Sequence, residues 1–123
     1  MIIQNITDMI GNTPLLKMSD SIEYYAKIEG NNLFGSVKDR AAKFLIEHAY
    51  SDGIIKKDTT IIESSSGNFG IALAGMCKIK GNSFICVVDP NITEFNRKII
   101  ELLGAEVILA CNADKNGNYV QDR

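Results

Sequence analysis

The sequence predicts an α/β fold, a three-layer domain in which an open parallel sheet carries helices on both faces. Short runs typical of strands alternate along the chain with longer amphipathic or apolar runs typical of helices. Their order is strand, helix, strand, helix, strand, helix, strand, and right-handed crossovers then make the strands parallel. The chain has 123 residues, 46% of them hydrophobic and 23% charged, which suits about one globular domain.

The chain begins with an extended arm, a strand and a helix. Pro14 forces Thr13 into an extended conformation. Residues 24–29 alternate in polarity and are rich in strand formers, which predicts the first strand. Apolar side chains recur at helical spacing over residues 37–50, and Gly53 suits the end of that helix.

The rest of the chain continues the same alternation. Three further strands are predicted, at residues 59–63, 83–88 and 107–109. One nearly all-apolar helix is predicted to begin at residue 71 and to end at Gly81. Thr93 is a plausible N-cap for another helix, which Gly104 would end. Residues 112–118 are polar and predict a loop.

Charge and composition exclude several classes of function. The formal net charge of −2 gives no basic surface, so nucleic acid and anionic membranes are not expected as partners. No apolar run approaches the roughly 20 residues of a membrane-spanning helix. The three cysteines, Cys77, Cys86 and Cys111, are expected to be reduced thiols in a cytoplasmic protein. No metal site is expected, because there is no Cys-x-x-Cys motif and His48 is the single histidine.

Lys38 is the first candidate for chemistry, in the segment Gly-Ser-Val-Lys-Asp-Arg at residues 35–40. It lies in the first turn of a predicted helix, where the positive end of the helix dipole disfavours an ammonium. The amine is therefore a candidate to form a Schiff base. A solvated lysine that happens to begin a helix is the alternative. A phosphate-binding loop is rejected, because Ser36 follows Gly35 where that motif needs lysine.

The loop at residues 64–70, Ser-Ser-Ser-Gly-Asn-Phe-Gly, is the second candidate. It joins a strand to a helix and so directs backbone N–H groups and hydroxyls toward one point, which suits a carboxylate or a phosphate. An ordinary turn with Ser66 as N-cap is the alternative. Ligands of parallel sheets bind beyond the carboxyl ends of the strands, so Lys38 and this loop should face one crevice. Together they describe a site for an amino acid that reacts at its α-carbon.

The chain also resembles a known family, the fold-type II pyridoxal-phosphate enzymes of the cysteine synthase and cystathionine β-synthase group. The resemblance rests on residues 10–15, 26–29, 32, 35–40, 63–74 and 104–106, in the order of the family. Within the family, the chain is most similar to the synthases of the 2,3-diaminopropionate pathway, through residues 46–50, 61–74, 86–90 and 117–119. Those synthases join O-phospho-L-serine to L-glutamate for siderophore or antibiotic precursors.

The resemblance implies pyridoxal 5'-phosphate as cofactor and a role for each candidate residue. Lys38 would bond the cofactor and then act as acid and base at the substrate α-carbon. Asn68 would hydrogen-bond the ring hydroxyl oxygen of the cofactor. The substrate carboxylate would be held by the loop that contains Ser65, Ser66, Gly67, Asn68 and Phe69. The reaction would be a β-replacement on a small amino-acid substrate.

The chain departs from the family in two ways. Phe69 stands where cysteine synthases usually have threonine, which argues against that activity. The glycine-rich loop for the cofactor phosphate and the partner of the pyridine nitrogen have no counterpart here. We therefore expect the amino-terminal part, a little over a third, of a homodimeric enzyme, inactive by itself. Residues 1–30 would form an arm and first strand that pack toward a larger domain, and residues 31–123 a small substrate-binding domain.

Two other functions stay open from the sequence. The first is cysteine synthase, which would combine O-acetylserine or O-phosphoserine with sulfide. The second is a non-catalytic module that keeps the fold and binds only a partner or a carboxylate ligand.

Overall fold

The computed structural model describes residues 2–112, 114, 118 and 119, so the loop predicted over residues 112–118 lies partly outside the described residues. One short 3₁₀ helix begins the order of elements, and a second one precedes the first long helix. The elements in order are η1 (Ile6–Met9), β1 (Leu15–Lys17), β2 (Tyr25–Lys27), η2 (Glu29–Asn31), α1 (Lys38–Ser51), β3 (Ile61–Ser64), α2 (Asn68–Lys80), β4 (Phe84–Val88), α3 (Glu94–Leu102) and β5 (Glu106–Leu109).

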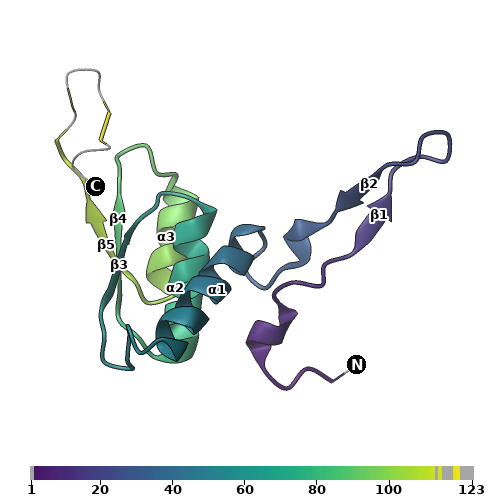
Figure 1. Cartoon of the computed structure of the whole chain (residues 1–123). Coiled ribbons are helices and arrows are strands. Elements are labelled where there is room, and N and C mark those ends of the chain that lie inside the picture. Colours follow the sequence, from purple (N-terminus) through teal and green to yellow (C-terminus); the bar gives the residue numbers. More distant parts are fainter. Residues whose placement is uncertain (1, 113, 115–117, 120–123) are drawn as a thin grey trace.

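The parallel sheet contains β3, β4 and β5 in that spatial order. Ile61 is paired with Phe84, and Cys86 with Val107, so the carboxyl ends of the strands lie at one edge. Two successive right-handed crossovers in the same direction place α2 and α3 on one face of the sheet, as Figure 1 shows. The alternate residues Phe84, Cys86 and Val88 of β4 are buried on that face.

The opposite face of the sheet is apolar but open. Ile62 is 63% exposed and Ile108 is 43% exposed. In Figure 1 no helix of the described part of the chain covers this face. The α/β class with an open parallel sheet is confirmed, and the described residues form two of the three predicted layers.

The prediction that the first strand joins the parallel sheet is wrong. β2 pairs antiparallel with β1, with Leu15 opposite Lys27 and Lys17 opposite Tyr25. A hairpin between near neighbours in sequence needs only a short connection, whereas a parallel pair needs a crossover of a dozen residues or more. The hairpin projects away from the helices in Figure 1. The domain division at residue 30 stays a prediction.

The helix ends follow the predicted residues at most positions. Gly53 and Gly104 adopt left-handed φ angles of 71° and 94° just after α1 and α3. The Thr93 hydroxyl accepts the Asn96 N–H at 3.2 Å and caps α3. The second long helix, α2, begins at Asn68 rather than at the predicted residue 71.

α2 is the centre of the core. Its residues 70–77 are all buried between the sheet on one side and α1 and α3 on the others. Gly75 lets α2 approach the loop before α1, because a Cβ there would lie 2.2 Å from the Phe34 ring. This contact fixes the segment that leads into Lys38 against the helix that begins with Asn68.

Candidate active site

Lys38 is exposed and is the first residue of α1. Its backbone N–H donates to the Ser36 hydroxyl oxygen at 3.1 Å. The neighbouring Asp39 is fully buried, and its carboxylate accepts the Phe34 N–H at 2.6 Å and the Ser36 hydroxyl at 3.3 Å. Burial raises the pKa of Asp39. The buried Asp39 side chain thus fixes the turn that carries Lys38 by hydrogen bonds, while the Lys38 side chain faces solvent.

A polar network anchors the same turn to the amino-terminal arm. Arg40 forms a double hydrogen bond to Glu29, from Nε to Oε2 at 2.7 Å and from Nη2 to Oε1 at 3.0 Å. The hydrogen bond from Arg40 lowers the pKa of Glu29 to about 2. Thr13 donates to Glu29 at 2.9 Å, and the Asn32 amide donates to the Ser36 carbonyl at 3.0 Å. Asn32 also accepts the Gly11 N–H at 2.8 Å.

The loop at residues 64–70 turns sharply from β3 into α2. The Ser65 hydroxyl oxygen accepts the Gly70 N–H at 2.9 Å, so Ser65 satisfies one amide of the first helical turn. Gly70 sits so close to this loop that an added Cβ would lie 2.6 Å from the Ser65 carbonyl oxygen. The alternative of an ordinary turn with Ser66 as N-cap is not found, because Gly67 occupies that position and has no side chain to cap with.

Successive backbone N–H groups at the start of α2 remain without an acceptor. In the described part of the chain, none is found for the amides of Gly67, Asn68 and Phe69. The next two amides are paired: that of Gly70 donates to the Ser65 hydroxyl oxygen at 2.9 Å, and that of Ile71 donates to the Gly67 carbonyl at 3.3 Å. Unpaired amides at the positive end of a 13-residue helix attract an anion. This geometry agrees with the predicted carboxylate cradle.

Asn68 borders a hollow of about 560 Å³ that it shares with the loop before Lys38. Leu33, Phe34 and Gly35 line the other side. The structure therefore places the loop that leads to Lys38 beside the start of α2. No described contact joins the Lys38 amine to residues 64–70, and the shared crevice stays a prediction.

The side chains of Ser66 and Phe69, which were predicted to lie in the substrate-carboxylate loop, make other contacts. The Ser66 hydroxyl donates to the carboxylate of Asp89 at 3.0 Å. The Phe69 ring packs against the hydrophobic core, so only its backbone faces the anion site. Asp89 and Asn96, which both contact Ser66, were not predicted. Asp89 follows β4 directly, so the rule that placed ligands beyond strand ends could have identified it.

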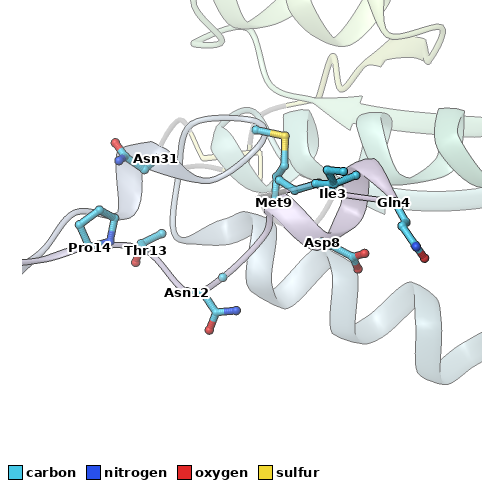
Figure 2. A pocket seen from close by; sticks show the side chains of 10 residues that line it. Ile3, Gln4, Asp8, Met9, Asn12, Thr13, Pro14 and Asn31 are labelled. Atoms are coloured by element: carbon cyan, nitrogen blue, oxygen red, sulfur yellow. The ribbon is translucent and has the colours of Figure 1, made fainter.

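A second hollow, of about 550 Å³, lies at the amino-terminal arm. Figure 2 shows it between the first residues of the chain and the segment that contains Asn12, Thr13 and Pro14. It contains none of the predicted site residues, and Asp8 is its one titratable side chain. The predicted site residues thus lie outside this hollow.

The described residues provide neither a metal cluster nor a membrane span. No group of three His, Cys, Asp or Glu side chains in the described part of the chain could hold a metal ion. Among the described helices, none is long and apolar enough to cross a membrane.

Comparison with protein families matches residues 6–123 to the pyridoxal-phosphate dependent enzymes. The chain belongs to this family. The match covers the arm, Lys38 and the loop at residues 64–70 together, and it confirms the family and the cofactor that the sequence predicts.

Three solved structures of other proteins show the same fold. A hydrogen sulfide-producing enzyme from Fusobacterium nucleatum is 40% identical, with a TM-score of 0.84 over 89% of this chain and 38% of that one. O-ureido-L-serine synthase is 34% identical, with a TM-score of 0.85 over 98% of this chain and 40% of that one. An O-acetylserine dependent cystathionine β-synthase from Helicobacter pylori is 35% identical, with a TM-score of 0.83 over 99% and 42%. The chain thus spans about two fifths of the length of these relatives.

Proposed function

We propose that a protein containing this chain is a pyridoxal-phosphate dependent synthase that replaces the β-substituent of O-phospho-L-serine with the amine of L-glutamate. The product is the precursor of 2,3-diaminopropionate, used for siderophores or antibiotics. The observation that carries the proposal is the set of unpaired amides at Gly67, Asn68 and Phe69, next to the loop that leads to Lys38. We propose a cytoplasmic homodimer.

The residues present fit the cofactor and an amino-acid substrate. Lys38 offers an exposed amine, and Asn68 an exposed side-chain amide at the edge of the hollow. The amides of Gly67 and Phe69 and the hydroxyl hydrogen of Ser65 supply donors for a carboxylate. When bound, pyridoxal phosphate withdraws electrons from the α-carbon of an attached amino acid, so that its proton and then its β-substituent can leave.

Within this proposal the residues of the site divide the tasks. Lys38 would bond the cofactor and would later remove and return the proton at the substrate α-carbon. The amides at the start of α2 would hold the substrate carboxylate, which would fix the direction of the α-hydrogen toward Lys38. Asn68 would hold the cofactor ring by a hydrogen bond to its hydroxyl oxygen. Because the reacting atoms are then held next to one another, they do not have to meet by diffusion, and this lowers the barrier to reaction.

The names of the relatives support a β-substituted serine as the first substrate. One is an O-ureido-L-serine synthase and another is described as O-acetylserine dependent. The similarity of residues 86–90 to the 2,3-diaminopropionate synthases supports glutamate as the second substrate. A cysteine synthase is the second candidate, because the relative described as O-acetylserine dependent uses a first substrate that a cysteine synthase also takes. Phe69 argues against it, since its ring packs against the core and brings no hydroxyl to the position where cysteine synthases usually have threonine.

A product assay separates these functions. A holoenzyme that contains this chain is given O-phospho-L-serine with either glutamate or sulfide, and the products are identified by mass spectrometry. We expect the glutamate adduct with O-phospho-L-serine. Cysteine as the preferred product would favour the second candidate, and no product with a normally bound cofactor would favour the non-catalytic module. Inactivity of the 123-residue chain by itself stays a prediction.

A further inference from the structure

We propose that Asp89 and Asn96 are positioning residues for the substrate-carboxylate loop, and that they act through Ser66. This inference rests on the proposed function, because it concerns the same loop. We use the name Ser66 clamp for these three side chains together with the loop backbone to which they are bonded. The clamp joins the loop before α2 to Asp89, which follows β4, and to Asn96, which lies in the first turn of α3.

The first half of the clamp is a reciprocal pair of hydrogen bonds. The Ser66 hydroxyl donates to Asp89 Oδ2 at 3.0 Å, and the Asp89 N–H donates back to the Ser66 hydroxyl oxygen at 3.3 Å. The other carboxylate oxygen of Asp89 accepts the Asn91 N–H at 2.9 Å, which orients the carboxylate. A hydroxyl has one hydrogen to donate. The hydrogen of Ser66 is therefore committed to Asp89 and not to a ligand.

The second half of the clamp holds the backbone. The Asn96 side chain donates from Nδ2 to the Ser66 carbonyl oxygen at 3.1 Å. Asn96 is itself fixed at the start of α3, because its own N–H donates to the capping hydroxyl of Thr93. Ser66 is therefore hydrogen-bonded at its side chain by Asp89, just after β4, and at its carbonyl by Asn96 in α3.

The carbonyl of Ser66 and the N–H of Gly67 belong to one peptide unit. That unit is planar and its two polar groups point in opposite directions. By fixing the carbonyl oxygen, Asn96 also sets the direction in which the Gly67 N–H points. This N–H is the first of the unpaired amides that we assign to the substrate carboxylate. The clamp therefore orients the anion site before a ligand arrives, which lowers the cost of binding.

A set of variants in the holoenzyme tests the clamp. Asp89→Ala and Asn96→Ala each remove one of its contacts, and Asp89→Asn keeps one acceptor oxygen. Asp58→Ala is the matched control, at an exposed aspartate in the turn before β3 and outside the clamp. The readouts are KM and kcat with O-phospho-L-serine, the melting temperature, and the extent of borohydride-trapped cofactor on Lys38. We expect KM to rise about fivefold in each alanine variant of the clamp, the effect of about one lost hydrogen bond. Cofactor attachment, kcat and the control should not change.

A double-mutant cycle distinguishes positioning from direct contact. If Ser66 acts through Asp89, Ser66→Ala should raise KM as much as Asp89→Ala, and the double variant should be no worse than either. A rise in Ser66→Ala with none in Asp89→Ala would overturn the inference, because Ser66 would then bind the substrate itself. If Asp89→Ala fails to fold, Asp89→Asn must still raise KM by a smaller factor, and an unchanged KM there would also overturn it.

The same data separate the inference from the proposed function. A wild-type holoenzyme without cofactor on Lys38 would overturn both. Normal attachment at Lys38 with unchanged KM in every clamp variant would overturn the inference alone.

Discussion

Gly70→Ala is the substitution whose effect the structure determines most directly. Gly70 is buried in the first turn of α2, and its N–H donates to the Ser65 hydroxyl at 2.9 Å. A Cβ at this position would lie 2.6 Å from the Ser65 carbonyl oxygen and 3.1 Å from Cys86 Sγ. The closest obstacle is backbone, so it cannot rotate away. Either α2 or the loop must shift.

Three effects of different sign set the magnitude. Overpacking a tight site typically costs about 1–3 kcal/mol. Moving Ser65 also weakens its hydrogen bond with the Gly70 amide, which costs about 1 kcal/mol. Alanine is the better helix former by about 1 kcal/mol, which offsets the lost hydrogen bond. The net expectation is a loss of about 2 kcal/mol in the free energy of unfolding, or roughly 10 °C in melting temperature.

Urea unfolding of the purified chain measures this loss, with Gly30→Ala as control. No atom lies within 4 Å of a Cβ at Gly30, so that variant should stay within about 0.5 kcal/mol of wild type. Ile100→Val is a second check, because Ile100 is a side-chain neighbour at 3.3 Å. Adding it to Gly70→Ala should not restore stability. Full rescue by Ile100→Val, or a Gly70→Ala variant as stable as the control, would refute the assignment of the clash to the Ser65 backbone.

Two further predictions concern titration and thiols. The pKa of Glu29 is held at about 2 by Arg40, below its usual 4.5, so this pair stabilises the fold above about pH 4.5 and stops doing so as the pH falls toward about 2. The difference in urea midpoint between wild type and Glu29→Gln should therefore shrink over that range, and a constant difference would contradict the assignment. Burial raises the pKa of Cys77 to about 11 and also raises that of Cys86. Iodoacetamide at pH 8 should modify the exposed Cys111 first in the folded chain, and equal labelling of all three thiols without denaturant would contradict the structure.

The helix ends were predictable because local chemistry determines them. Gly53 and Gly104 adopt the left-handed conformations that end α1 and α3, and Thr93 supplies the cap of α3. The pairing of β2 was not predictable in this way. A three-residue strand carries too little pattern to choose between a hairpin and the parallel sheet, and the choice depends on where the arm docks.

For the loop at residues 64–70, the sequence predicted the position of the loop but not the contacts of its individual side chains. Its location followed from its composition and its place after a strand, and its anion-binding character stays a prediction. In a run of three serines, however, the sequence does not say which hydroxyl accepts an amide of the first helical turn and which bonds another segment. The backbone path places the Ser65 hydroxyl against the Gly70 N–H and directs Ser66 to Asp89. Contacts between residues 23 positions apart depend on tertiary packing and carry no local signal.

The central claim, that Lys38 bonds the cofactor, is tested most directly by borohydride reduction and peptide mapping. A protein that contains this chain is mixed with pyridoxal phosphate, reduced and digested, alongside Lys38→Ala and the control Lys98→Ala, an exposed lysine of α3. We predict one modified peptide, which contains Lys38, that is lost in Lys38→Ala and kept in Lys98→Ala. Modification scattered over surface lysines, or a modified peptide that persists in Lys38→Ala, would contradict the claim.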